Sequence, residues 1–523
     1  MRSRPLALTL ICAVVVLQAC APSRPARRDV VIGLVGEPAS VFADDPNARI
    51  IAAAVTEQLV RRDAHDDLVP RLALRVPTIE NGGLVVVTDD PVAPEGRLVA
   101  TFELRSDLTW QDGAPLTSAD VRFAWETERA AALGSEERWT ADRVERVDVV
   151  TDRLVRLTYR ANERWDGYAL AARVLPEHLL ANASPQQRAR YAREPVHAGP
   201  FSVAAWLPGI GVTLSAFKGY ALGAPALGRL EIRFFAGRTA LLDALRRGDV
   251  DVVPSPGLEA DLAATLDRFA DSTTLQTFYK QAESIEMLRY GARFADPVLR
   301  QAVELAIDRR KLSLALFEGR ALVPRSYLVA PGWAASDAGS LPGVDREHAR
   351  ALLQAAGYTR GSFGVLEHAG DRFTVSILVS AGSVARTAAA HLVAGDLAAI
   401  GIAADVREEP AEAAAAAQAS GAFDLAIQAE DVSDPQRATE RYRGTAGAWF
   451  DTLAGAAAGA ADRAEKRLLY AELERAWDDA RPALPLYQQL LVDVAPRTLA
   501  GVDPASAGSP LTWNVREWRF TTP

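Results

Sequence analysis

The sequence predicts an α/β protein of two lobes, with a further small α/β domain inserted into the N-terminal lobe. The chain has 523 residues, which is too long for one compact hydrophobic core. Strand patterns of period two alternate with capped amphipathic helices over residues 286–484, and this alternation is typical of a doubly wound sheet. Residues 66–193 instead combine short alternating strands with two helices, which indicates a smaller mixed domain.

The clearest element of the inserted domain is a strand followed by a tight turn and a capped helix. Apolar residues alternate with other residues over 98–104, as expected of a strand with one buried face. Asp112 and Gly113 then predict a turn, because glycine tolerates positive φ. Thr117 and Asp120 have the spacing of a capping box, so we expect a helix to begin there. Both aspartates are interpreted as structural residues.

The first lobe opens with a strand at residues 30–34 and a helix over residues 48–60. The loop between them contains Glu37 and Ser40. Ligands of open α/β sheets bind beyond the carboxyl ends of the strands, so both residues are candidate ligand contacts. Glu37 could equally be a solvated loop acid, and the sequence leaves the two alternatives open.

Later elements of the first lobe are a hairpin and a helix flanked by strands. Residues 201–206 and 212–217 predict the hairpin, with a Pro-Gly turn between them. Residues 230–234 predict a strand, Thr239 can cap the next helix, and residues 250–253 predict another strand. A strand, a helix and a strand in this order indicate a βαβ unit with parallel strands.

The second lobe begins with a helix that Asp296 caps and that continues to Asp308. Residues 490–494 predict a strand that returns the chain to the first lobe. We expect further helices at residues 345–357, 384–400, 410–419 and 464–477, and strands at residues 373–379, 402–406 and 424–427.

The loop after the last of these three strands contains Gln428, Glu430 and Asp431. It again follows the carboxyl end of a strand, which makes the three residues candidate ligand contacts. Solvated loop acids are the alternative for Glu430 and Asp431. Asp434, which precedes a proline, is interpreted as a turn or cap residue.

The N-terminal residues have the features of a secretory signal. Two arginines precede an apolar run at residues 6–17, which is too short to span a membrane as a mature helix. The sequence Leu-Gln-Ala-Cys that ends at Cys20 resembles a bacterial lipobox. We therefore expect a signal peptide at residues 1–19, lipidation of Cys20 and a tether at residues 20–28, with the protein held at the outer face of the cell membrane or in the periplasm. An ordinary signal peptide with a chance cysteine is the alternative.

Several motifs together resemble those of the extracytoplasmic solute-binding proteins of ABC importers, in the oligopeptide-, dipeptide- and nickel-binding class known as family 5. In the family's order, they are the turn and helix motif of Trp110, Asp112, Gly113, Leu116, Asp120 and Val121, the sequence His-Ala-Gly-Pro-Phe at 197–201, Leu-x-x-Gly-x-x-Asp ending at Asp251, the helix with Arg300, Ala302, Ala306, Ile307 and Asp308, and Ala-x-x-Leu-Leu-x-x-Ala-Gly-Tyr ending at Tyr358. The resemblance covers nearly all of the mature chain.

This resemblance implies a periplasmic-binding-protein-like fold of type II, in its large class. The first-lobe core is then expected to comprise residues 29–65, 194–285 and 485–523. The inserted domain is expected at residues 66–193 and the second lobe at residues 286–484.

The resemblance also bears on the ligand contacts. The loops that contain Glu37 and Asp431 correspond to segments that line the cleft in the family. Peptide binders of the family place an aromatic residue and an acid in the second segment, whereas this chain has alanine followed by Glu430. In the strand that leaves the hinge, where the family commonly has an asparagine, this chain has Arg289 and Tyr290, which are further candidates.

The function that the resemblance implies is capture of a small solute by hinge closure and its delivery to the transmembrane subunits of an ABC permease, by a monomer without a cofactor. Peptides are the favoured solute, and the family also binds nickel complexes, opines and sugars. An acidic pair near Asp431 could hold the ammonium group of a peptide. Two alternatives stay open: a relative that has lost transport and serves as a lipoprotein scaffold or sensor, and a periplasmic hydrolase.

The sequence contains no catalytic or metal-binding motif. Its six histidines form no His-Glu-x-x-His pair, and no Gly-x-Ser-x-Gly elbow or phosphate-binding glycine loop is present. Of the two cysteines, Cys12 lies in the signal and Cys20 would be lipidated, so no thiol remains for a disulfide. Loss of the two signal arginines takes the formal net charge from −9 to −11, which argues against nucleic acid as a partner. We therefore expect neither catalytic residues nor a metal site.

Overall fold

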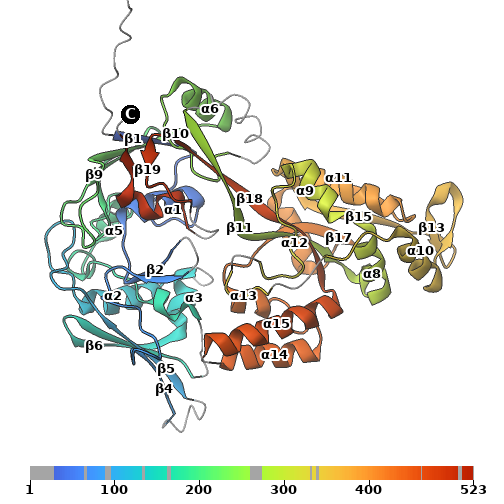
Figure 1. Ribbon diagram of the computed structural model, residues 1–523, viewed down its shortest axis with the longest axis horizontal. Coiled ribbons are helices and arrows are strands. Elements are labelled where there is room, and N and C mark those ends of the chain that lie inside the picture. The colour runs from blue at the N-terminus through green and yellow to red at the C-terminus, as the bar shows by residue number, and fades with distance from the viewer. Residues whose placement is uncertain are drawn as a thin grey trace, which may run out of the picture.

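The structure is a computed structural model of the 523-residue chain. The residues that it describes are 29–63, 67–88, 96–131, 136–161, 166–258, 274–329, 332–336, 341–460, 462–504 and 509–521. The predicted signal peptide, Cys20 and the tether lie outside the described residues. Figure 1 shows two lobes joined by two long strands, β11 (Leu275–Tyr290) and β18 (Ala483–Pro496), which are called the hinge strands below.

A four-stranded sheet in the order β1-β10-β9-β8 forms one part of the first lobe. Its strands are β1 (Asp29–Val35), β8 (Phe201–Leu207), β9 (Gly211–Ala216) and β10 (Arg229–Phe235). Strands β1 and β10 are parallel, whereas β8 and β9 form the predicted antiparallel hairpin. Apolar side chains of α1 (Pro46–Val55) and η4 (Leu511–Glu517) pack in the core on one face, and those of α6 (Arg238–Arg247) pack on the other.

The first helix is shorter than predicted. It ends at Val55 instead of residue 60, and Thr56 is extended. Glu57 is buried and accepts a hydrogen bond from the hydroxyl of Tyr220. Tyr220 lies far along the chain, so local periodicity could not reveal this contact of Glu57.

The predicted βαβ unit also differs from the structure. Gly237 is the N-cap of α6, so the prediction that Thr239 caps this helix is wrong. Residues 250–253 do not form a strand ladder, because Val252 pairs with β1 and the next residue, Val253, pairs with β18. The chain changes partner after one residue and crosses from the sheet to the hinge.

A second four-stranded sheet in the first lobe has the order β4-β5-β7-β6, with antiparallel neighbours throughout. Its strands are β4 (Leu84–Val87), β5 (Arg97–Glu103), β6 (Val144–Thr151) and β7 (Leu154–Tyr159). The predicted capping box begins α2 (Ser118–Arg129), and the backbone N–H of Thr117 donates to Asp120 Oδ2 over 2.9 Å. Gly113 has a φ of 89° in the predicted turn. This sheet and helix enclose a core of their own around Trp110.

Shorter elements complete the first lobe. They are β2 (Val60–Arg62), β3 (Leu68–Pro70), α3 (Glu136–Arg143), η1 (Asp166–Ala171), α4 (Glu177–Leu180), α5 (Pro185–Arg193), β19 (Leu499–Ala500) and β20 (Arg519–Phe520).

The second lobe is built on a five-stranded sheet in the order β16-β15-β17-β11-β18. Strands β15 (Thr374–Ser380), β16 (Ala403–Glu409) and β17 (Leu425–Asp431) are parallel, and β11 is antiparallel to β17 and β18. The carboxyl ends of β15 and β17 point toward the first lobe, because the end of β17 pairs with the middle of β11, where that strand arrives from the first lobe. The sheet therefore confirms the predicted doubly wound alternation.

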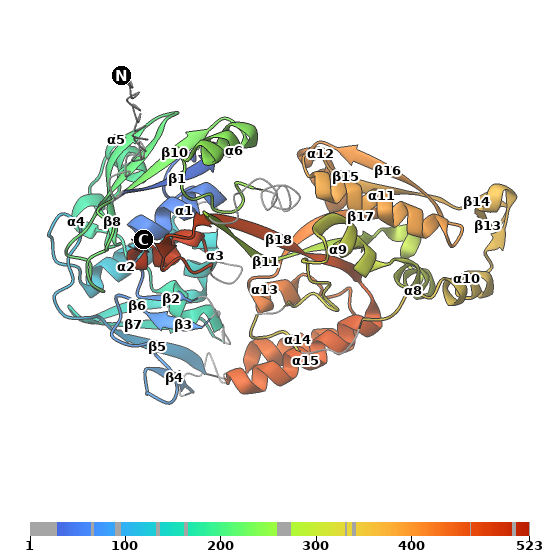
Figure 2. The same ribbon diagram turned by 45° about the horizontal axis from the view of Figure 1, so that its top comes forward.

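Helices cover both faces of this sheet, as Figure 2 shows. One face carries α8 (Pro297–Ala306), α9 (Arg309–Phe317), α10 (Arg346–Ala355) and α11 (Val384–Ala398), and the other carries α13 (Pro435–Glu440), α14 (Ala448–Gly459) and α15 (Arg463–Ala480). The remaining elements are α12 (Ala411–Ser420), β12 (Thr359–Arg360), β13 (Leu366–His368), β14 (Asp371–Arg372), η2 (Ala292–Phe294) and η3 (Ser362–Gly364).

The helix predicted to run through Asp308 is two helices. Ile307 is extended and buried, so α8 ends at Ala306. Asp308 caps α9 by accepting a hydrogen bond from the backbone N–H of Lys311 at 2.9 Å. An aspartate that was interpreted as the end of one helix is the start of the next.

Candidate functional site

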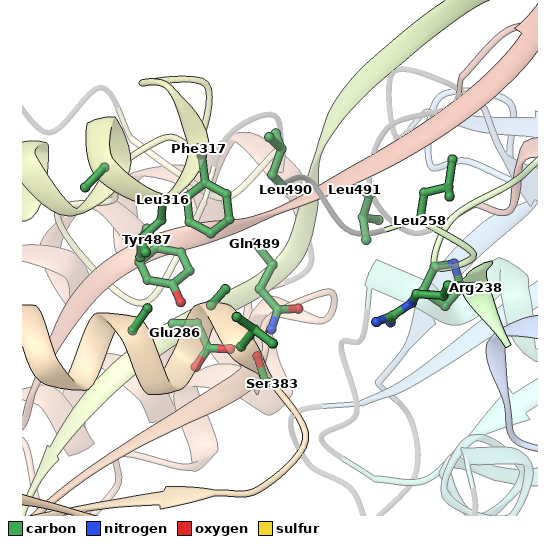
Figure 3. A pocket seen from close by; sticks show the side chains of 15 residues that line it. Arg238, Leu258, Glu286, Leu316, Phe317, Ser383, Tyr487, Gln489, Leu490 and Leu491 are labelled. Carbon is green, nitrogen blue, oxygen red and sulfur yellow. Dashed lines mark hydrogen bonds between the residues drawn. The ribbon is translucent and has the colours of Figure 1, made fainter. Parts of the chain in front are cut away.

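A cavity of about 390 Å³ lies between the two lobes, next to hinge strand β18 (Figure 3). The first lobe contributes Arg238, Pro256 and Leu258, and the second lobe contributes residues of α9 and α11. The hinge strands supply the remaining wall, which includes Glu286 and Gln489. The volume is within the range of about 300–1,000 Å³ that is usual for small-molecule sites.

Two strand-to-helix connections place this cavity at the carboxyl ends of both main sheets. Strand β10 ends just before α6, whose first residue is Arg238. Strand β15 ends just before α11, whose N-cap is Ser383. Because backbone N–H groups at a helix N-terminus lack partners within the helix, both connections bring partial positive charge to the cavity.

A buried ion pair connects the hinge strands to α11 of the second lobe. One partner is Glu286, which lines the cavity, and the other is Arg386. The Glu286 carboxylate accepts from Arg386 Nε at 2.9 Å and from Arg386 Nη2 at 2.8 Å. Gln489 Nε2 donates to the same carboxylate at 2.7 Å, and Arg386 Nη1 donates to Ser380 Oγ at 2.7 Å. The hydrogen bonds to Glu286 raise the pKa of Arg386 above its ordinary value. These contacts fix the first turn of α11 to hinge strand β11.

Tyr487 stands beside this ion pair. Its side chain is 2% exposed, and its ring packs against Phe317 with 4.9 Å between centroids. Among the described residues its hydroxyl has no hydrogen-bond partner, and the residue lines the cavity. Burial raises the pKa of Tyr487, so the hydroxyl keeps its proton and can donate a hydrogen bond to a bound solute.

None of the seven residues predicted as ligand contacts lines this cavity. Three of them come together on the other face of the second-lobe sheet. The carboxylate of Glu430, which is 3% exposed, accepts from Arg289 Nη1 at 3.0 Å and from Gln428 Nε2 at 3.1 Å. Its second oxygen accepts from Arg441 Nη1 at 3.1 Å and from the Tyr442 hydroxyl at 2.7 Å. Both carboxylate oxygens of Glu430 therefore accept hydrogen bonds from other residues of the protein.

The other four predicted contacts are separate from this cluster. Glu37 accepts from Trp206 Nε1 and from the backbone N–H of Gly209, both at 2.7 Å. Ser40 is half-buried in the same loop. Tyr290 packs near Phe294 in the second lobe, with 5.9 Å between ring centroids, and Asp431 is exposed and accepts from the backbone N–H of Ser433 at 2.9 Å. Their role in solute binding stays a prediction.

Sequence reasoning missed Arg238, Glu286, Ser383 and Tyr487. Ser383 follows a predicted strand, so the carboxyl-end rule that selected Asp431 would also have selected Ser383. Arg238 follows the strand predicted at residues 230–234, so the same rule would have selected it as well, whereas Glu286 and Tyr487 carried no such signal. Glu286 and Tyr487 lie in hinge strands whose pattern shows which residues alternate but not that each faces a cavity.

Aspartates interpreted as structural have that role in the structure. Asp112 accepts from the backbone N–H of Ala114 at 3.0 Å and lies 2.8 Å from His178 Nε2, which agrees with the structural interpretation of Asp112. Asp434 caps α13 by accepting from the backbone N–H of Arg437 at 2.8 Å. Among the described residues, no group of three or more histidine, cysteine, aspartate or glutamate side chains is placed to hold a metal ion. Nor does this part of the chain contain a helix long and apolar enough to cross a membrane.

The chain matches known proteins over most of its length. The family of bacterial extracellular solute-binding proteins, family 5, matches residues 68–449. Protein XP55 of Streptomyces lividans is 26% identical over 383 residues, which are 72% of this chain and 66% of that protein. The oligopeptide-binding protein AppA of Bacillus subtilis is 23% identical over 389 residues, or 72% of this chain and 68% of AppA. The alignments thus span about two-thirds of each relative. This chain belongs to the family 5 solute-binding proteins.

Solved structures show the same fold. NikZ of Campylobacter jejuni, in complex with Ni(L-His), superposes with a TM-score of 0.74 at 20% identity over 94% of this chain and 99% of NikZ. AppA of Bacillus subtilis, in complex with a nonapeptide, gives a TM-score of 0.71 at 20% identity over 94% of this chain and 99% of AppA. The predicted two-lobed α/β fold is thereby confirmed.

Proposed function

We propose that this chain is the solute-binding subunit of an ABC importer and that its solute is a small molecule, with peptides as the first class to test. The solute enters the cavity beside the hinge strands, the lobes close on it, and the closed form delivers it to the transmembrane subunits of a permease. No bond of the solute is made or broken, so the protein is not an enzyme. It works as a monomer, outside the cytoplasm.

One observation carries this proposal: the cavity takes its walls from both lobes, next to the two strands that join them. Leu258 of one lobe and Val384 of the other line the same cavity, so a solute bound there touches both lobes at once. It therefore binds the closed arrangement more tightly than the open one, and this difference in affinity is what drives closure.

A thermal-shift screen tests the proposal. The chain from residue 21 onward is freed of co-purified ligand by partial unfolding and refolding, and is then mixed with pools of di- to pentapeptides, sugars and nickel–histidine. A solute at one hundred times its Kd adds about 2.7 kcal/mol to the free energy of unfolding, which raises the melting temperature measurably. Stabilisation by a peptide pool supports the proposal. No stabilisation by any pool would contradict it and favour a scaffold or sensor role.

We also propose that lipid on Cys20 holds the protein to the membrane, with residues 20–28 as the tether. Cells that express the full chain would incorporate a labelled fatty acid into it, and Cys20→Ser would abolish both labelling and membrane retention. Incorporation that persists in Cys20→Ser would contradict this assignment.

We propose the domain boundaries in the same way, with residues 66–193 inserted in the first lobe. Limited proteolysis of the folded chain should then cut first near residues 65 and 194. Initial cuts inside the 66–193 segment would contradict these boundaries.

A further inference from the structure

Charged side chains of both signs line the cavity, whereas the net charge of the chain is −9. Among the described residues, the charged residues of its wall are Glu286 and Arg238. Glu286 is 2% exposed and both of its oxygens are occupied, since Arg386 binds them at two points and Gln489 donates to one. Arg386 neutralises Glu286, so a solute in the cavity meets little negative charge from this wall.

Positive charge reaches the cavity from both lobes. Arg238 is exposed at the first position of α6, and the N-cap of that helix, Gly237, offers no side chain to occupy the first backbone N–H groups. On the opposite side α11 begins at Val384, which also lines the cavity. Ser383 caps α11 by accepting from the backbone N–H of Arg386 at 3.3 Å. The remaining N–H groups of the two helix N-termini that face the cavity favour a negatively charged group between them.

The hydroxyl of Tyr487 is the second observation that points to a ligand. It belongs to a residue that is 2% exposed, it has no hydrogen-bond partner among the described residues, and it lies on the cavity wall, where Figure 3 shows it on the side of the ring that faces Glu286. The hydroxyl oxygen is still accessible to water in the cavity, and a donor that loses this water without gaining a new partner costs free energy. When the lobes close and water leaves, an acceptor oxygen on the solute satisfies this donor.

Apolar side chains make up most of the remaining wall. Leu258 comes from the first lobe, Leu316 and Val384 from the second, and Leu490 from hinge strand β18. Val384 is 68% exposed, so it has apolar surface left to bury against a solute. Such a wall stabilises a solute with an apolar body by removing apolar area from water.

We propose that the solute is a carboxylate with an apolar body, whose charged group faces Arg238 and the N-termini of α6 and α11 and one of whose oxygens accepts a hydrogen bond from the Tyr487 hydroxyl. This inference rests on the proposed function and names the class of solute for the same cavity. A peptide with an apolar side chain next to its C-terminus and a free medium-chain carboxylic acid share this chemistry.

Two matched probe pairs test the inference by calorimetric titration of the chain from residue 21 onward. Leucyl-leucine is compared with leucyl-leucinamide, and octanoate is compared with octanamide. Within each pair only the carboxylate changes. We expect at least one acid to bind about tenfold more tightly than its amide, or more, because hydrogen bonds to a charged group are stronger than those to a neutral one. The pair that shows this difference identifies a peptide or a free acid as the source.

Two variants with matched controls assign the effect to residues. Arg238→Gln should bring the ratio of acid to amide affinity close to one, whereas Arg247→Gln, in the last turn of the same helix, should leave it unchanged. Tyr487→Phe removes only the hydroxyl and should weaken binding of the acid about five- to tenfold. Tyr358→Phe, which changes a tyrosine of the second lobe outside the cavity wall, should have no effect.

Several results would overturn the inference. They are equal affinity for acid and amide in both pairs, an acid preference that survives Arg238→Gln, and failure of all four probes to bind. In the last case the pooled thermal-shift screen separates the two proposals. Stabilisation by some other solute would keep the solute-binding function and reject the carboxylate, whereas no stabilisation at all would reject both.

Discussion

Arg386 of α11 and Glu286 of hinge strand β11 meet at two points, with N–O distances of 2.9 and 2.8 Å. Their side chains are 13% and 2% exposed. The pair joins the first turn of the helix that borders the cavity to the strand that crosses between the lobes. The orientation of this cavity wall therefore depends on a buried ion pair instead of on apolar packing alone.

Breaking this pair on one side should destabilise the protein strongly. Arg386→Met leaves the buried carboxylate of Glu286 without its cation, and loss of one partner of a buried pair costs about 3–5 kcal/mol. The double variant Glu286→Met/Arg386→Met removes both charges and should recover part of the loss. Urea denaturation measures both, and Arg475→Met, which breaks an exposed pair with Glu472, is the control that should change little. A double variant no more stable than Arg386→Met would contradict the argument.

Glu430 and Asp431 are neighbours in sequence, yet we expect their substitution to change the free energy of unfolding by very different amounts. Glu430→Ala removes a buried carboxylate that binds Arg289, Arg441 and Tyr442, so the free energy of unfolding should fall by about 3–5 kcal/mol. Asp431→Ala removes an exposed side chain and should alter stability little. If Asp431 holds an ammonium group, as the sequence predicts, the same variant should weaken peptide binding. Calorimetry and urea denaturation on both variants separate the two effects, and comparable stability of the two variants would refute the distinction.

His197 should make the protein less stable as the pH falls. Burial lowers the pKa of His197 to about 3, and its Nδ1 accepts from the backbone N–H groups of Ala198 and Glu57 at 2.9 and 3.2 Å. Between pH 6.5 and about 3 the unfolded chain binds a proton here that the folded chain does not. This group alone therefore lowers the free energy of unfolding by about 1.4 kcal/mol for each pH unit below 6.5.

The variant His197→Asn isolates this contribution, since Oδ1 of asparagine can accept in place of Nδ1 without titrating. Its stability should depend less steeply on pH over this window than that of the unchanged chain. His348→Asn, at an exposed position of α10, is the control and should keep the original slope. Denaturation at pH 4, 5, 6 and 7 measures the slopes, and equal slopes for His197→Asn and the unchanged chain would show that His197 is not buried in its neutral form.

Glu37 should hold the tip of the β8–β9 hairpin. Its carboxylate accepts from Trp206 Nε1 and from the backbone N–H of Gly209, each at 2.7 Å. Glu37→Ala should therefore speed hydrogen exchange of the Gly209 amide by one to two orders of magnitude, as about 1–3 kcal/mol of local protection is lost. Glu231→Ala, on the neighbouring strand β10, should leave that amide unchanged. An unchanged rate in Glu37→Ala would mean that this carboxylate is free to contact a solute.

Features set by short-range contacts could be predicted from the sequence. Thr117 and Asp120 are three residues apart, and each satisfies a backbone N–H of the same helix turn, so spacing alone identified the cap. The same holds for Asp434 and for the alternation of strands and helices in the second lobe. Local hydrogen bonds and periodicity are enough to predict these features, although distant residues also contact them, as the backbone N–H of Glu177 does by donating to Asp120 Oδ1 at 3.0 Å.

Features set by distant contacts could not be predicted in this way. Glu57 lies beyond the end of α1 and accepts a hydrogen bond from Tyr220, which is 163 positions away in the chain. Glu286 finds Arg386 at a separation of 100 positions, and Tyr487 enters the same wall from a strand near the end of the chain. The cavity exists only because two lobes and two hinge strands come together, so its residues share no spacing that a sequence pattern could carry.

The most direct test of the account is whether a solute needs the space between the lobes. Ala388 lies on α11 and lines the cavity, whereas Ala398 is exposed at the far end of the same helix. Calorimetric titration of a solute found in the screen should give a Kd at least a hundredfold weaker for Ala388→Trp, because the indole fills the cavity, and an unchanged Kd for Ala398→Trp. Equal affinity of the Ala388→Trp variant and the unchanged chain would place the solute elsewhere and contradict the account.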